Sequence, residues 1–136
     1  MAGFPSREQH KLKISKQILV FMPLCIAFSA SFARAECAFS PFSFFPDRND
    51  TVHIQVAADN ESYCDNSFRE GPGSRFTNVS VTKAPQHGVI ATLGPKHFAY
   101  HPFANYHGND EYTIRACATV GQKKGCSTLI YEIKVR

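Results

Sequence analysis

The sequence predicts an all-β domain, a two-sheet antiparallel β-sandwich of six to seven short strands. Apolar residues after residue 50 alternate with period two, as strands that bury one face require. Turns rich in Gly, Pro and Asn separate the alternating runs, and no run after residue 36 has the three-and-four spacing of an amphipathic helix. A chain of 136 residues has room for one domain with one hydrophobic core.

Residues 1–35 have the pattern of a cleaved signal peptide. Basic residues gather before residue 17, and an uncharged apolar run extends from Ile18 to Ala33. Ala33-Arg34-Ala35 then places small side chains where signal peptidase cleaves, so we expect cleavage before Glu36. The alternative is a membrane anchor, but the 16 uncharged residues fall short of the roughly 20 that span a bilayer. We therefore expect no stable membrane span after cleavage.

Cleavage at this point would change the charge balance of the chain. Five of the 15 Lys and Arg residues and one of the 11 Asp and Glu residues precede Glu36, which leaves ten of each. A protein that neutralises nucleic-acid phosphates needs a basic surface, so the sequence does not predict nucleic-acid binding. The expected location is periplasmic or secreted.

Four cysteines follow residue 35, and in an exported domain they predict two disulfides with three possible pairings. Strand parity places Cys117 and Cys126 outward on adjacent antiparallel strands, where cross-strand Cβ atoms lie about 4.5–5.5 Å apart. That separation is close to the range a disulfide spans. The favoured pairing is therefore Cys117–Cys126, which leaves Cys37–Cys64.

The first half of the exported chain combines one clear strand with less regular segments. Residues 36–50 are rich in Phe and Pro and should form an extended lead-in against the core. The sandwich domain should span residues 51–136, beginning with a half-buried strand at residues 51–57 whose inward residues are Val52, Ile54 and Val56. Residues 58–74 are rich in Asp, Asn, Ser and Gly and are expected to form a long loop, where binding residues tend to lie.

The second half contains the remaining expected strands. A strand beginning at Arg75 should bury Thr77, Val79 and Val81, and residues 89–93 and 97–101 should pair as a hairpin with Phe98 and Tyr100 inward. The two longest strands follow residue 110 and are joined by a turn at residues 121–125. Their inner faces should be formed by Tyr112, Ile114, Ala116, Ala118 and Val120 on the first strand and Leu129, Tyr131, Ile133 and Val135 on the second.

This half also contains three motifs: Pro85-Gln86-His87-Gly88, the strand Phe98-Ala99-Tyr100-His101-Pro102, and the corner from Tyr106 to Tyr112. Together they resemble the bacterial Ig-like or cadherin-like repeats. The resemblance implies an immunoglobulin-type sandwich in a surface or secreted protein, commonly an adhesin or a spacer. It gives architectural roles to Pro85, His87, Gly88, Tyr100, Pro102, Gly108 and Asp110. Asp110 is expected to cap the corner turn by accepting backbone N–H bonds.

Two groups of residues are candidate cation sites. Histidines are common ligands of transition metals, and one alternative is a metal site formed by His87, His97 and His107. On one strand, His97 and His101 would lie about 13 Å apart, too far to bind one ion together. Calcium is a second possibility, since one loop contains Asp59, Glu61, Asp65 and Glu70.

No catalytic signature supports an enzyme. The chain lacks a Gly-x-Ser-x-Gly elbow, a His-Glu-x-x-His motif and a glycine-rich phosphate loop. The sequence therefore predicts a non-catalytic binding, adhesion or structural module in the cell envelope or outside the cell. Its partner would be a protein or a surface glycan. The alternative is a periplasmic metal-binding protein that uses the histidine cluster.

Overall fold

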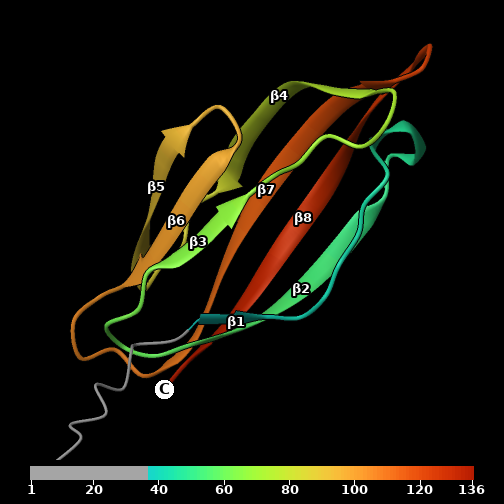
Figure 1. The fold of residues 1–136 in the computed structure, drawn as a ribbon. Helices are drawn as coiled ribbons and strands as arrows, with labels where there is room; N and C mark the ends of the chain where they lie inside the picture. The colour runs from blue at the N-terminus through green and yellow to red at the C-terminus, as the bar shows by residue number, and fades with distance from the viewer. Residues whose placement is uncertain (1–36) are drawn as a thin grey trace, which may run out of the picture. The chain divides into compact units, whose positions relative to one another are not determined.

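The structure, a computed structural model, describes residues 37–136, which form a two-layer β-sandwich (Figure 1). The five-stranded layer, sheet A, has the order β1-β2-β8-β7-β4, and the three-stranded layer, sheet B, has the order β3-β6-β5. In chain order the elements are β1 (Cys37–Phe39), the 3-10 helix η1 (Pro46–Arg48), β2 (Thr51–Ala58), β3 (Cys64–Ser67), β4 (Ser74–Lys83), β5 (Gly88–Gly94), β6 (His97–Pro102), β7 (Gly108–Val120) and β8 (Lys123–Val135). The all-β, two-sheet prediction is confirmed, although the strands number eight. The predicted signal peptide lies outside the described residues.

The Phe-rich lead-in is part of the sandwich. Its first residues form β1, which pairs antiparallel with β2 at the edge of sheet A. Phe39 and Phe42 then meet the ring of Tyr131 edge-on, with centroids 6.4 and 6.1 Å away. At its end, η1 docks on β8, where Asn49 Oδ1 accepts a hydrogen bond from the backbone N–H of Cys126 (3.0 Å). These apolar contacts explain why a proline-broken segment is ordered against the core.

The loop expected at residues 58–74 contains a strand. Residues Cys64–Ser67 form β3, which pairs antiparallel with β6 at the edge of sheet B. The strand is short and polar, so it carries almost no alternation signal. Its inward-facing Asn66 hydrogen-bonds through Nδ2 to the hydroxyl oxygen of Tyr131, which satisfies the amide inside the sandwich.

The prediction that all strands pair antiparallel is wrong for one pair. β2 runs parallel to β8, with Ile54 opposite Tyr131 and Val56 opposite Ile133. Period-two alternation places the same residues inward for either strand direction, so the sequence pattern could not distinguish the two arrangements.

A second correction concerns the inner face of β4. Thr77 was expected to face inward, but it is exposed, while Phe76 is half-buried against the core. The register shifts between Phe76 and Asn78, so Thr77 is the extra residue of a β-bulge. A bulge reverses the alternation on one side of it, and the prediction held only for Val79 and Val81 on the other side.

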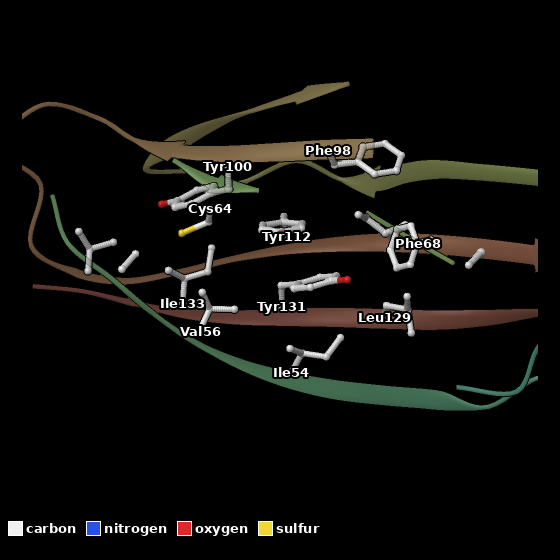
Figure 2. Close-up of a cluster of buried hydrophobic side chains, with 14 residues drawn as sticks. Ile54, Val56, Cys64, Phe68, Phe98, Tyr100, Tyr112, Leu129, Tyr131 and Ile133 are labelled. Atoms are coloured by element: carbon white, nitrogen blue, oxygen red, sulfur yellow. The ribbon is translucent and has the colours of Figure 1, made fainter. Parts of the chain in front are cut away.

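Tyrosines from both sheets form the centre of the core. Figure 2 shows Tyr100 of β6 above Tyr112 of β7 and Tyr131 of β8. The rings of Tyr112 and Tyr131 stack at 4.5 Å, and those of Tyr100 and Tyr112 at 5.7 Å. All three side chains are almost fully buried, and burial raises the pKa of each phenol far above its ordinary value.

Two disulfides add covalent links to this core. Cys37–Cys64 connects β1 of sheet A to β3 of sheet B, with Cα atoms 5.3 Å apart. Cys117–Cys126 links directly opposed residues of β7 and β8, with Cα atoms 3.9 Å apart. Both pairings match the prediction, in which strand parity favoured Cys117–Cys126 and Cys37–Cys64 was the pair that remained. From residue 37 to the end of the chain, no helix is long and apolar enough to cross a membrane.

Candidate functional site

The Asp110 carboxylate is the best-connected polar group among the motif residues. Oδ1 accepts hydrogen bonds from the backbone N–H groups of Gln86 and Glu111 (both 2.9 Å). Oδ2 accepts from the N–H of His87 (3.0 Å) and from the hydroxyl of Tyr100 (2.8 Å). Asp110 therefore accepts backbone bonds as expected, but most come from the distant turn before β5 rather than from its own corner.

The two glycines of these motifs permit close approaches. A Cβ at Gly88 would lie 2.5 Å from a ring carbon of Tyr100, and one at Gly108 would lie 2.8 Å from the hydroxyl oxygen of Tyr106. Gly108 also has a φ of 145°, which L side chains rarely adopt. Pro102 is buried and stands opposite Gly88, at the end of β6. The motif residues thus position one another, with Pro85 opening the turn that Asp110 holds.

The histidines do not converge on one point. The ring of His87 stacks on Tyr106 at 4.2 Å, whereas His97 Nε2 is paired with the carboxylate of Asp65. Gly88 is paired with Pro102, five residues along β6 from His97, so the two rings lie at opposite ends of a hairpin about 17 Å long. His107 is exposed in the segment before β7. In residues 37–136 no three His, Cys, Asp or Glu side chains are grouped as metal ligands would be.

The acidic residues of the 58–74 segment are also dispersed. Asp59 lies 3.4 Å from the guanidinium of Arg136, and Asp65 pairs with His97. Glu70 Oε1 accepts the backbone N–H of Phe76 at 2.9 Å, and this bond lowers the pKa of the Glu70 carboxyl. The calcium prediction therefore has no shared set of oxygen ligands among these carboxylates.

The outer face of sheet B gathers exposed apolar residues. We call it the sheet-B face and define it by the outward side chains of its three strands and of the residue before β3: Tyr63, Asp65, Ser67, Val89, Ala91, Leu93, His97, Ala99 and His101. Three large members are well exposed, namely Tyr63 (70%), Val89 (55%) and Leu93 (57%). Between them lie Ala91 and Ala99, which are directly paired across β5 and β6.

Contacts to neighbouring groups hold the polar rings of the sheet-B face. His101 stacks on Tyr63 with centroids 4.2 Å apart and an interplanar angle of 9°. Its Nδ1 lies 3.0 Å from the carbonyl oxygen of Ser62, and His97 is tied to Asp65. Because these side chains are already oriented, less side-chain entropy would be lost when a partner bound to this face.

A second feature, on the outer side of sheet A, is a polar hollow of about 480 Å³. Glu111 and Glu132 stand directly opposite each other on β7 and β8 at this hollow. Lys83 Nζ lies 2.7 Å from Glu111, and His53 Nδ1 lies 2.9 Å from Glu132. The hydrogen bond from His53, followed by that from Gln55, lowers the pKa of the Glu132 carboxyl. A general acid needs a raised pKa, so this shift does not suit Glu132 for that role.

Comparisons with known proteins add little to this geometry. No protein-family model matches the chain, and no curated protein matches it. Among solved structures, it is similar to a cysteine protease inhibitor from Entamoeba histolytica, with 16% identity and a TM-score of 0.32. That match covers 66% of this chain and 90% of the inhibitor chain. A likeness this weak carries no argument about function.

The sequence analysis did not identify the sheet-B face or the opposed glutamates. Strand parity could have found parts of both. Val89 and Leu93 have the parity opposite to the inward Ile90, and Glu111 and Glu132 each neighbour an inward tyrosine. Tyr63 carries no such signal, because it lies in a polar segment outside any alternating run.

Proposed function

We propose that this protein is an exported, Ig-like, non-catalytic binding module that contacts a protein partner through the sheet-B face. The exposure of Tyr63, Val89 and Leu93 on one face is the observation that carries this proposal. Isolated exposed apolar residues are ordinary, but several on one flat sheet surface are typical of interaction sites. Tyrosine is also enriched among the residues that dominate binding energy at protein interfaces.

Export is supported by two features. The two disulfides, Cys37–Cys64 and Cys117–Cys126, suit an oxidising compartment such as the periplasm or the extracellular space. The basic and apolar pattern of residues 1–35 is that of an export signal. The Ig-like assignment is supported by the three turn and corner motifs and by the two-sheet architecture that contains them.

The chemistry of the sheet-B face suits a protein partner with apolar side chains better than a highly charged ligand. Asp65 is the acidic member of the face, and it is already paired with His97. The remaining surface offers methyl groups and two stacked rings, which complement apolar or aromatic side chains. No observation in residues 37–136 favours the metal-binding alternative, because the histidines point to different neighbours.

The proposal can be tested by capture of partners from the envelope or culture medium of the source organism. The baits would be the wild-type protein, Tyr63→Ala and, as a matched control, Phe45→Ala. Phe45 is 45% exposed and lies in the lead-in, away from the sheet-B face. Truncating a central interface tyrosine costs about 2 kcal/mol, so Tyr63→Ala should weaken binding of the captured partner about 30-fold.

The control decides how the capture experiment is interpreted. Phe45→Ala should bind the partner as the wild type does, and both variants should keep the wild-type circular-dichroism spectrum. Equal binding by all three baits would contradict the sheet-B face as the site. Binding of a purified surface glycan, rather than a protein, with the same dependence on Tyr63 would replace the proposed partner class.

A further inference from the structure

We infer that β5 is a self-pairing edge, through which two copies of this chain join their three-stranded sheets into one six-stranded sheet. β5 is the outermost strand of sheet B, and Figure 1 shows it on the side of β6 away from β3. One row of its backbone N–H and C=O groups therefore faces away from the sheet. This inference goes beyond the proposed partner-binding function and does not depend on it.

The other edges of the described sandwich have features that discourage pairing. β1 has three residues and β3 has four, with Asp65 exposed on β3. β4 is longer, but it carries Arg75 and Lys83 and has two register shifts along its length. Short strands, charges and bulges are the usual protections of a sheet edge.

β5 lacks these protections over most of its length. Its seven residues, Gly88–Gly94, include no charged side chain and no proline. Its register shift with β6 falls at the end, between Thr92 and Gly94. From Gly88 to Thr92 the edge is uncharged and regular, and Leu93 is the residue without a partner on β6. Such an edge, with Val89 and Leu93 exposed, is suited to receive another strand.

The hydrogen-bond pattern shows which backbone groups are free. The N–H of Phe103 donates to the carbonyl oxygen of His87 (2.8 Å), so this opposed pair is hydrogen-bonded. Alternation along the antiparallel ladder then directs the backbone N–H and C=O groups of Val89 and Ala91 toward β6. The same groups of Ile90 and Thr92 are directed toward the free edge. The position of Pro102 opposite Gly88 fits this phase, because proline has no N–H to donate.

The order of residues in β5 makes the strand complementary to itself. An antiparallel pair with its two-fold axis at Ala91 would place Ile90 of each copy opposite Thr92 of the other, where their free backbone groups can bond. Val89 of each copy would then stand opposite Leu93 of the other, in the closer, non-hydrogen-bonded type of pair. The small Ala91 would face its own copy at the axis. Because this pairing uses the β5 edge of both copies, no β5 edge remains for a third copy, and the assembly would close at two.

The inferred dimer can be tested by placing charges at its axis. Ala91 is exposed, so Ala91→Lys and Ala91→Glu should both fold. In each variant two like charges would face each other across the axis, and the dissociation constant should rise at least about tenfold. A mixture of the two variants should recover the dimer, because Lys and Glu would then be opposed. Thr77→Lys, on the exposed bulge of β4, adds the same charge at another edge and should leave the dimer intact.

The measurement is the molar mass in solution, by sedimentation or light scattering, of protein expressed from the full sequence with its own N-terminus. The wild type and Thr77→Lys should show twice the mass of one chain, and the single Ala91 variants the mass of one. A wild type that stays monomeric up to about 0.5 mM would overturn the inference. Equal masses for Ala91→Lys and Thr77→Lys, failure of the mixture to dimerise, or an assembly larger than two copies would also overturn it.

Discussion

Removal of the Asp110 carboxylate should destabilise the sandwich more than removal of any other single polar group in the corner motifs. Asp110 is buried at the start of β7 in sheet A, and its carboxylate accepts a hydrogen bond from the hydroxyl of Tyr100 in sheet B. It also accepts hydrogen bonds from the backbone N–H groups of Gln86 and His87, which precede β5. The side chain therefore connects three segments that are distant in sequence.

The expected loss in the free energy of unfolding follows from the hydrogen bonds that each donor would lose in Asp110→Ala. The N–H groups of Gln86 and Glu111 lie near the surface, where water can partly replace the carboxylate. The buried hydroxyl of Tyr100 would lose its acceptor, and an unsatisfied buried group costs about 1–3 kcal/mol. With the loss of charge-assisted bonds to the turn, the free energy of unfolding should fall by about 3–5 kcal/mol. This is a large fraction of the about 5–15 kcal/mol that stabilises a typical domain.

The assay is urea denaturation followed by far-ultraviolet circular dichroism, since the chain has no tryptophan. Tyr100→Phe removes only the hydroxyl and should cost about 1–2 kcal/mol. A double-mutant cycle with Asp110→Ala should give a coupling of about 1 kcal/mol or more, because the two groups bond directly. A loss below about 1 kcal/mol for Asp110→Ala, or zero coupling with Tyr100→Phe, would refute the reasoning.

Other variants test the packing, the disulfide and the buried phenols. Gly125→Ala would drive its Cβ into a backbone carbonyl of η1 and should cost about 2–3 kcal/mol in urea denaturation, whereas Gly71→Ala, with open space around it, should be nearly neutral. Replacement of Cys117 and Cys126 by serine should lower the free energy of unfolding by about 2.5 kcal/mol, and an unchanged urea midpoint would contradict a stabilising link. Burial favours the neutral phenol of Tyr112 and raises its pKa above the ordinary value of 10. The stabilisation from burying this side chain is therefore fully present below pH 10 and is lost as the pH rises above 10. Tyr112→Phe should therefore show a shallower loss of stability than the wild type above pH 10, and parallel curves would argue against this linkage.

The sequence was most informative where alternation was long and uninterrupted. The inner faces of β6, β7 and β8 were predicted correctly from residues such as Tyr100, Ile114 and Ile133. The same parity placed Cys117 and Cys126 on one side of adjacent strands, where the structure joins them. In these strands, burial of one face is the dominant energetic requirement, and the sequence records it directly.

Other features of the fold left little trace in the local pattern. β3 is polar because its inward Asn66 bonds a tyrosine hydroxyl rather than packing as an apolar side chain. The bulge at Thr77 reverses the alternation without a glycine or proline to mark it. The direction of β2 relative to β8 depends on how the chain crosses between layers, which alternation does not encode.

The candidate site was harder to predict because its residues come from three strands and a preceding turn. Nearness in sequence suggested a histidine cluster, but the hairpin of β5 and β6 separates His87 from His97. The same hairpin brings Val89 beside His101, and β3 places Tyr63 against that ring. A surface built from neighbouring strands becomes visible only when the strand order is known.

The unequal sizes of the two sheets explain why the lead-in packs against the core. Sheet A has five strands and sheet B has three, so sheet B alone cannot cover the inner side of sheet A. Phe39, Phe42 and Phe44 supply the missing apolar cover, and Cys37–Cys64 fixes the start of this segment to sheet B. On the outer face of sheet B, Tyr63, Val89 and Leu93 are exposed, and β5 forms an edge without charged side chains. The difference in strand number therefore makes the lead-in a structural part of the core rather than a free extension.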